Sequence, residues 1–231
     1  FSPERLFVAI NSLDNREIDA ARDHWLANPT TLLEFRERNF LGPGPVILFV
    51  SRLLPANRVD LLVRATCQLS HRIPSLKTVI VGNGDAEKSR LRALADSAGA
   101  SDNVVFVDGI YDEMKLAPWF LTADVFCYPA NIGLSLIHAF WYGLPVVTSD
   151  RTSIQNPEIV ALDSGVNGLC YEHGSVESLT AALENILFDR GLQQSMSQSA
   201  RTTVEEQFTI SRMVDGLDAA IRFVYHSATH K

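Results

Sequence analysis

Short apolar runs alternate with longer amphipathic stretches along most of this chain. Four to six consecutive apolar residues predict a buried strand, and apolar residues at helical spacing predict the helix that follows. Strands are predicted at residues 46–50, 78–81, 104–107, 124–128, 145–148 and 169–171. Helices are predicted at residues 59–70, 85–98, 113–121, 133–143, 156–162 and 176–188, with helical segments continuing to 224. Because the strand runs are continuously apolar, they indicate an α/β fold: a Rossmann-like parallel sheet with helices on both faces.

The first 44 residues follow a different pattern. Residues 6–10 (L-F-V-A-I) predict a short strand, and residues 16–38 predict a helical region interrupted near Asn28 and Pro29. The run G-P-G-P at 42–45 then breaks the chain. We therefore divide the sequence into a linker strand with a helical lead-in, 1–44, and a Rossmann-like domain, 45–231. Residues 211–225 predict an amphipathic helix that could fold back over another domain.

The most informative unit lies at residues 124–148. An apolar strand ends at Pro129, Gly133 opens a helix and Gly143 closes it. In a parallel sheet, ligands bind past the carboxyl ends of the strands, where the first turn of the next helix offers free N–H groups to an anion. Ser135 lies within that turn and is able to donate to a phosphate or to cap the helix. The pattern indicates a phosphate-bearing ligand, and an ordinary strand–turn–helix unit explains it about equally well.

Two arginines follow the first strand of the domain. Ser51 and Arg52 come directly after it, and Arg58 begins the next helix. An arginine fork suits a diphosphate, while an exposed surface arginine is an equally good explanation for Arg52. A cation is disfavoured at a helix N-terminus, which favours a functional reason for Arg58. The turn Gly82–Asn83–Gly84 lacks the full dinucleotide fingerprint and reads first as a tight turn.

His138 lies just over one turn inside the helix that starts near Gly133. Its neighbours Ile137 and Phe140 are apolar, so a half-buried structural histidine is somewhat more plausible than a catalyst. No D-x-D pair, zinc-type Cys/His spacing, Walker A motif or G-x-S-x-G elbow is found. We therefore expect no metal and no cofactor, with arginine and backbone amides holding any ligand.

Composition narrows the classes of partner. The chain of 231 residues has 27 acidic and 20 basic residues, a net charge of −7, which argues against nucleic-acid binding. No apolar run approaches the roughly 18 residues that cross a bilayer, and the polar start is no signal peptide. Cys67, Cys127 and Cys170 are scattered in apolar surroundings, as expected of reduced cysteines in a cytosolic protein.

Taken in order, blocks of this sequence resemble the donor-binding domain of the group 1 retaining glycosyltransferases of GT-B architecture. The resemblance covers nearly the whole chain. The blocks are F-V-A-I-N-S-L-D (7–14), V-I-L-F-V-S-R-L-L-P-A-N-R-V-D-L-L-V (46–63), V-I-V-G-N-G-D (79–85), V-V-F-V-D-G (104–109), A-D-V-F-C-Y-P (123–129), G-L-P-V-V-T-S (143–149), P-E-I-V-A-L-D-S-G-V-N-G (157–168) and A-R-T-T-V-E-E-Q-F (200–208).

The resemblance implies the C-terminal half of a GT-B fold, which binds a UDP- or GDP-sugar, while a missing N-terminal domain binds a glycan or lipid-linked acceptor. It also implies a cytoplasmic setting, with peripheral association at the inner membrane, and polysaccharide assembly as the common role. By resemblance Arg52 clasps the donor diphosphate, Ile110 lies near the base, and backbone amides from Gly133 to Ser135 meet phosphate and sugar. The candidate site residues are Arg52, Arg58 and His138 for catalysis, and Ser51, Asn57, Gly82, Gly84, Ile110, Asn131, Ile132, Gly133, Leu134 and Ser135 for donor binding.

This sequence departs from the family pattern at several of those positions. The family's pair of glutamates, seven residues apart, corresponds to Ala130 and His138, and its phosphate-binding lysine corresponds to Asn57. The glycine usual before the arginine is Ser51. Three hypotheses follow: a transferase donor domain whose arginines and helix-end amides stabilise the leaving diphosphate, a non-catalytic glycosyltransferase-like module, and, with least support, a related GT-B enzyme such as a nucleotide-sugar epimerase.

Overall fold

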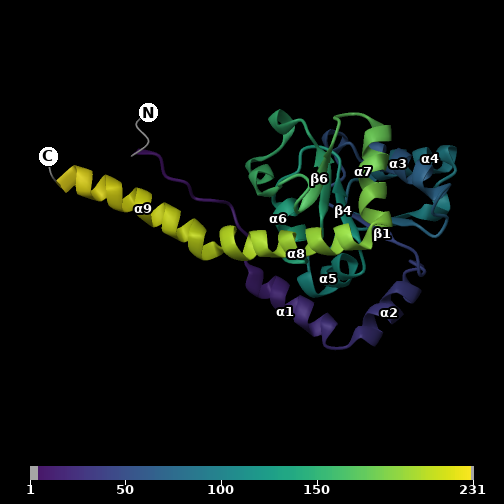
Figure 1. Ribbon diagram of the computed structural model, residues 1–231, viewed down its shortest axis with the longest axis horizontal. Coiled ribbons are helices and arrows are strands. Elements are labelled where there is room, and N and C mark those ends of the chain that lie inside the picture. Colours follow the sequence, from purple (N-terminus) through teal and green to yellow (C-terminus); the bar gives the residue numbers. More distant parts are fainter. Residues whose placement is uncertain (1–4, 230–231) are drawn as a thin grey trace.

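The computed structural model describes residues 5–229 and contains one six-stranded sheet (Figure 1). All of its strand pairs are parallel, and their order across the sheet is β3-β2-β1-β4-β5-β6. The strands are β1 (Val46–Val50), β2 (Lys77–Val81), β3 (Val104–Val107), β4 (Val125–Tyr128), β5 (Val146–Ser149) and β6 (Gly168–Tyr171). This order places β1 and β4 side by side at the centre, and the predicted α/β Rossmann-like fold is confirmed.

Helices surround the sheet in two groups. In one group, α3 packs against α4 and α7. In the other, α6 packs against α8, and α1 packs against α5. The helices are α1 (Asn15–Leu26), α2 (Pro29–Arg38), α3 (Val59–Ser70), α4 (Asp85–Ala98), α5 (Glu113–Leu121), α6 (Leu134–Trp141), α7 (Val176–Phe188), α8 (Arg190–Gln207) and α9 (Ile210–Thr229). The central strands β4 and β5 are buried at every residue, as a sheet covered on both faces requires.

Two predicted elements are wrong. Residues 6–10 form no strand; they run extended beside α9, whose backbone groups are already used in its own hydrogen bonds and offer no ladder. Residues 156–162 form only a short 3₁₀ turn, Pro157–Ala161, instead of an α-helix. The stretch is too short to nucleate a helix, and the backbone N–H of Asp163 donates to the side chain of Asn167, which turns the chain away.

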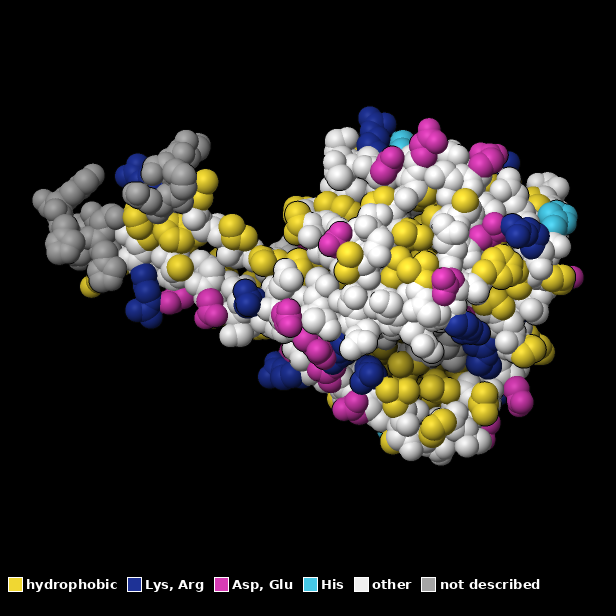
Figure 2. Space-filling model, viewed as in Figure 1, with side chains coloured by type: hydrophobic (Ala, Val, Ile, Leu, Met, Phe, Trp, Pro, Cys, Tyr) yellow, Lys and Arg dark blue, Asp and Glu magenta, His cyan; other side chains and the backbone are white. Residues whose placement is uncertain are grey.

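The helix α9 and the extended N-terminal segment form an arm that projects from the body (Figure 1). Phe7 packs on Phe223 with ring centroids 5.3 Å apart, and the backbone of Val8 lies against Gly216. An apolar stripe remains exposed on α9, made of Val214, Leu217, Ile221 and Val224. Figure 2 shows hydrophobic side chains along this arm. The helical lead-in, by contrast, packs on the body, where Ile18 and Ala21 join the core. The domain boundary near residue 45 stays a prediction.

Two glycines after β2 set the position of the loop after β1. A Cβ atom on Gly82 would lie 1.9 Å from the carbonyl oxygen of Ser51, far inside any real contact. Gly84 has a φ of 142°, and its Cβ would lie 2.6 Å from the carbonyl oxygen of Leu53. The backbone of Ser51–Leu53 therefore rests directly on the Gly82–Gly84 turn, which explains these glycines without a ligand.

We expect Gly82→Ala to destabilise the fold by about 1–3 kcal/mol, because the added methyl group forces the β1 loop away from β2. Urea denaturation measures this as a fall in the free energy of unfolding. The matched control is Gly191→Ala in α8, where the new Cβ meets only the Asp189 carboxylate, at 3.3 Å. If both variants unfolded at the same urea concentration, the close approach of Gly82 to the Ser51 carbonyl would make no contribution to stability.

Candidate functional site

The candidate site lies where the strand order reverses, between the loops that follow β1 and β4. The first loop leads to α3 and the second to α6, and these helices belong to different helix groups. In open parallel sheets this divergence leaves a crevice at the carboxyl ends of the central strands. Three contacts join the two sides. The Tyr128 hydroxyl donates to Ser51 Oγ at 3.0 Å, Ser135 Oγ donates to the Val50 carbonyl at 3.3 Å, and Asn131 Nδ2 donates to Asn57 Oδ1 at 3.4 Å.

Asn57 serves the loop that carries Arg52. Its side chain is 2% exposed, and its Nδ2 donates to the Arg52 carbonyl at 2.8 Å. With its Oδ1 facing Asn131, the Asn57 amide is fully engaged in joining the two loops. A donor-binding role for Asn57 stays a prediction; what the structure gives it is a structural role.

The two candidate arginines differ in their surroundings. Arg52 is exposed, and within residues 5–229 no hydrogen bond or ion pair involves its side chain. Arg58 has a left-handed backbone, with φ of 53°, and its guanidinium pairs with the Asp60 carboxylate through Nε at 3.0 Å and Nη2 at 3.2 Å. This pair raises the pKa of Arg58 above its usual value, chiefly through the hydrogen bonds to Asp60. Arg52 is thus the freer cation, while part of the charge of Arg58 is already compensated.

The start of α6 presents backbone donors to the crevice. In the described part of the chain, no hydrogen bond uses the backbone N–H of Gly133, Leu134 or Ser135, and Gly133 caps the helix without a side-chain bond. The N–H of Ile132 is already occupied, because it donates to Gln155 Oε1 at 2.7 Å. A ligand therefore has three amides available here, beginning at Gly133.

Side chains from the loop after β5 hold the β4–α6 loop in this shape. Asn131 has a left-handed φ of 66°. Asn156 Nδ2 donates to the carbonyl oxygens of Asn131 and Ile132, at 3.1 and 3.2 Å. Gln155 bonds the N–H of Ile132 on one side and the Ser149 carbonyl, at 3.0 Å, on the other. The free amides are consequently held in place before any ligand arrives.

The loop after β3 contributes Ile110 to the same edge of the sheet. Ile110 packs partly buried against the core, and its neighbour Tyr111 is 88% exposed. Asn83 ties this loop to the Gly82–Gly84 turn, since its Oδ1 accepts from the N–H of Gly109 at 2.8 Å. Ile110 thus lies beyond β2, two strands from the crevice, and its role beside a base stays a prediction.

His138 is paired with a carboxylate from the neighbouring helix. Its Nε2 lies 2.9 Å from Glu113 Oε1, and its ring lies against Phe120 with centroids 4.6 Å apart. The hydroxyl of Tyr142 also donates to Glu113 Oε1. Burial works against ionisation of Glu113, but the hydrogen bond and charge of His138, together with Tyr142, outweigh it and lower the pKa of Glu113 below its usual value. The edge of the sheet therefore still carries a carboxylate beside His138.

Three residues that the sequence analysis did not single out belong to this region. Glu113 is the first residue of α5 and reads in the sequence as an ordinary acidic helix start. Gln155 lies in a polar loop with no motif. His173 follows β6 directly, and the rule that selected Ser51 and Arg52, polar residues just past a strand, would have found it.

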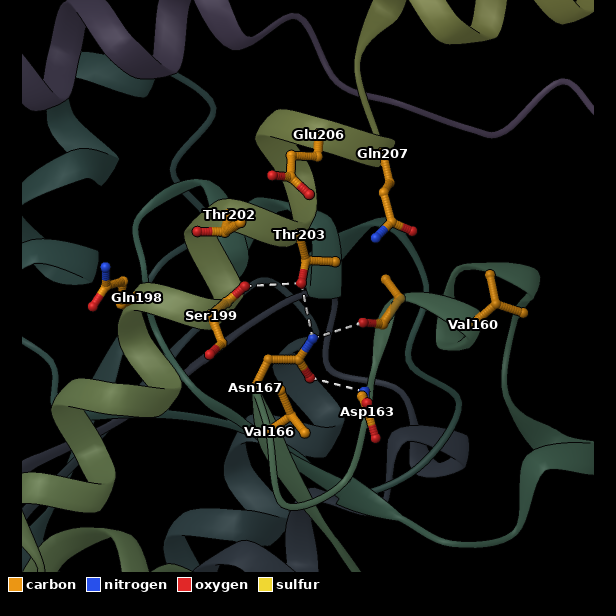
Figure 3. A pocket seen from close by; sticks show the side chains of 11 residues that line it. Val160, Asp163, Val166, Asn167, Gln198, Ser199, Thr202, Thr203, Glu206 and Gln207 are labelled. Atoms are coloured by element: carbon orange, nitrogen blue, oxygen red, sulfur yellow. Dashed lines mark hydrogen bonds between the residues drawn. The ribbon is translucent and has the colours of Figure 1, made fainter.

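A pocket of about 550 Å³ opens at the opposite edge of the sheet, where β6 begins (Figure 3). Its centre is Asn167, which is 2% exposed. The Nδ2 of Asn167 donates to the Ala161 carbonyl and to Thr203 Oγ1, and its Oδ1 accepts from the N–H of Asp163. These polar atoms hydrogen-bond to one another. The pocket is therefore explained by the turn that precedes β6, without a ligand.

The model of one protein family, described as glycosyl transferases group 1, matches residues 33–203. The chain belongs to this family. Among curated relatives, the GDP-mannose-dependent alpha-(1-6)-phosphatidylinositol monomannoside mannosyltransferase of Mycolicibacterium smegmatis is 32% identical over 189 residues, which are 78% of this chain and 48% of the relative. The chain spans about half the length of the curated relatives it matches first.

Solved structures of family-like proteins share the fold at low identity. A glycosyltransferase from Rickettsia africae superposes with a TM-score of 0.79 at 17% identity, over 93% of this chain and 56% of that one. Anabaena HepE in complex with UDP gives a TM-score of 0.72 at 16% identity, over 92% and 55%. These neighbours confirm the α/β architecture and its GT-B relationship.

We expect Glu113→Gln to lower stability at neutral pH by about 1 kcal/mol, because His138 and Tyr142 lose their charged partner. The lowered pKa of Glu113 means that its carboxylate stabilises the folded state above the ordinary pKa of 4.5, and that this contribution is lost as the pH falls through the lowered value. The difference in unfolding free energy between wild type and variant should therefore disappear between about pH 6 and pH 3. Thermal unfolding across this range measures it.

Glu34→Gln, an exposed carboxylate on α2, is the matched control and should show no such difference. A stability difference for Glu113→Gln that stayed constant down to pH 3 would mean that the charge of the Glu113 carboxylate contributes nothing to the fold.

Proposed function

We propose that this chain is the donor-binding half of a glycosyltransferase, and that it holds the diphosphate of a nucleotide sugar in the crevice between β1 and β4. The observation that carries the proposal is that an unpaired arginine, Arg52, and three unpaired backbone amides at the start of α6 lie on two loops that hydrogen bonds join at the centre of the sheet. Free N–H groups and the positive helix end favour an anion, and an arginine adds charge-assisted hydrogen bonds. Family membership supplies the reaction class.

In this proposal catalysis is mainly electrostatic. When the bond from sugar to phosphate breaks, negative charge accumulates on the departing diphosphate. Arg52 and the amides of Gly133, Leu134 and Ser135 stabilise that charge, with arginine and amides acting where other enzymes use a divalent ion. Arg58 supports them from the start of α3, with its charge shared with Asp60. The loops need no reorganisation, because Asn57, Gln155 and Asn156 already fix them.

The nucleotide is proposed to be UDP or GDP. One relative is named as GDP-mannose-dependent, and a structural neighbour is described in complex with UDP, so the comparisons favour neither. Ile110 is placed near the base, and the His138–Glu113 pair is placed at the same edge. The usual family carboxylate on the ribose hydroxyls would be replaced by this pair, with Glu113 supplying the negative charge.

The acceptor, a glycan or lipid-linked molecule, is proposed to bind a second half of the full-length protein. The arm of α9 with residues 5–12 carries an exposed apolar stripe, which suits it for packing against that half. No helix within residues 5–229 is long and apolar enough to cross a bilayer. We place the full-length protein in the cytoplasm, with peripheral contact at the membrane where a lipid-linked acceptor requires it.

A non-catalytic nucleotide-binding module is the second candidate. It is favoured by Ala130 and Asn57, which stand where the family pattern has a carboxylate and a lysine, and by the burial of Asn57. The two candidates share a binding site and differ in turnover, so kinetics on a full-length enzyme separates them.

Calorimetric titration with UDP, GDP and ADP tests the donor site. We expect saturable binding of UDP or GDP, weakened about ten- to a hundredfold by Arg52→Ala, since a hydrogen bond to a charged group contributes about 1.5–3 kcal/mol. The control is Arg64→Ala, an exposed arginine further along α3, which should bind like wild type. Equal affinity of both variants for the nucleotide would remove Arg52 from the site.

In a full-length enzyme, Arg52→Ala should lower turnover by about ten- to a thousandfold, because the same charge acts on the leaving diphosphate. Steady-state transfer kinetics with the donor identified by calorimetry measures this. Nucleotide binding with no transfer by the full-length wild type would favour the non-catalytic module.

A further inference from the structure

A second pocket adjoins the candidate site, on the other side of Asn131. It has a volume of about 320 Å³ and opens between the ends of β1, β4 and β6. Its walls are made by Ala56, Arg58, Ala130, Asn131, Ile154 and His173. The pocket shares Arg58 and Asn131 with the crevice described above, so one ligand can occupy both.

The side chains that line this pocket are basic or neutral. None of the lining residues is a carboxylate, while Arg58 and His173 bring two basic side chains from different strand ends. The ion pair with Asp60 uses Nε and Nη2 of Arg58, and no hydrogen bond among the described residues uses its Nη1. The Arg58 side chain is 39% exposed, so that face of the guanidinium is accessible.

His173 is held with its second ring nitrogen free. Its Nδ1 lies 2.9 Å from Ser149 Oγ, and its backbone N–H donates to Asp150 Oδ1 at 3.0 Å. Ser149 Oγ already accepts from the N–H of Arg151 at 3.1 Å, so its own proton is available for Nδ1. A neutral imidazole that accepts at Nδ1 carries its proton on Nε2. No partner for Nε2 occurs within residues 5–229, so in this tautomer Nε2 is free to donate.

We propose that His173 and Arg58 form an oxyanion subsite of the donor pocket, which receives either the distal phosphate of a nucleoside diphosphate or the carboxylate of an acidic sugar attached to it. The inference rests on the proposed function and adds a ligand-contacting residue, His173, to it. Two basic donors in a pocket with no carboxylate in its lining favour an anion, and Ala56, Ala130 and Ile154 supply the apolar part of that lining. Ala130 provides the room, because any larger side chain would occupy the pocket.

The first experiment follows the imidazole of His173 by NMR in the intact chain during titration with inorganic pyrophosphate. The His173 signal is assigned by its disappearance in His173→Ala. We expect a saturable shift in wild type and, by calorimetry, about tenfold weaker binding in His173→Ala and recovery of affinity in His173→Arg, which again places an N–H donor in the pocket. His71→Ala, an exposed histidine at the end of α3, is the matched control. A His173 signal that moves neither at saturating pyrophosphate nor at saturating UDP-glucuronic acid would overturn the proposal, and this measurement does not depend on the variant's folding.

Nucleotides then distinguish the two sources of the anion. If the pocket takes the distal phosphate, His173→Ala weakens binding of UDP or GDP about tenfold and leaves UMP or GMP unchanged. If it takes a sugar carboxylate, the variant weakens UDP-glucuronic acid and leaves UDP-glucose and UDP unchanged. Unchanged affinity for all of these, in a chain that binds nucleotide through Arg52, would overturn the subsite and leave the proposed function intact. A pyrophosphate response without nucleotide binding would support the subsite and overturn the proposed function.

Discussion

The close approach of the β1 loop to the Gly82–Gly84 turn is the constraint on which the rest of the site depends. Two glycines without side chains let the backbone of Ser51–Leu53 rest on the neighbouring strand end, and this contact fixes where Arg52 leaves the sheet. From there, Asn57 reaches back to the Arg52 carbonyl and across to Asn131, while Tyr128 reaches Ser51. The geometry of a charged crevice thus follows from a steric condition at the end of the neighbouring strand β2, with no charge involved in setting it.

Much of this architecture could be predicted from the sequence because it depends on local patterns. Continuous apolar runs gave all six strands, and Gly133 and Gly143 marked the ends of α6. The failures have physical causes. Residues 6–10 have strand-like composition, but their neighbour is a helix, and composition does not reveal which surface a segment meets. Residues 156–162 show helical spacing, yet the side chain of Asn167 accepts from the backbone N–H of Asp163 and turns the chain, a local contact that spacing of apolar residues does not reveal.

For the candidate site too, some residues could be predicted from the sequence and others could not. Arg52 and the start of α6 were predictable, because a position past a strand end has the same meaning in every parallel sheet. The pairing of Glu113 with His138 and the contact of His173 with Ser149 were not, because each joins residues more than twenty positions apart. The departures from the family pattern also take on a different meaning in three dimensions. Asn57 is a buried brace, and the negative charge absent from position 138 is present one helix away, on Glu113.

The contacts that hold the β4–α6 loop affect how the sequence of such a domain can change in evolution. The hydrogen bonds that hold this loop use the backbone of Pro129, Asn131 and Ile132 or the side chains of Asn57, Asn131, Gln155 and Asn156; the side chain of Ala130 takes part in none of them. Ala130 lines a cavity and makes no side-chain hydrogen bond. Evolution is therefore free to exchange this residue and retune what the cavity accepts, while the loop, the amides and the arginines around it stay where they are.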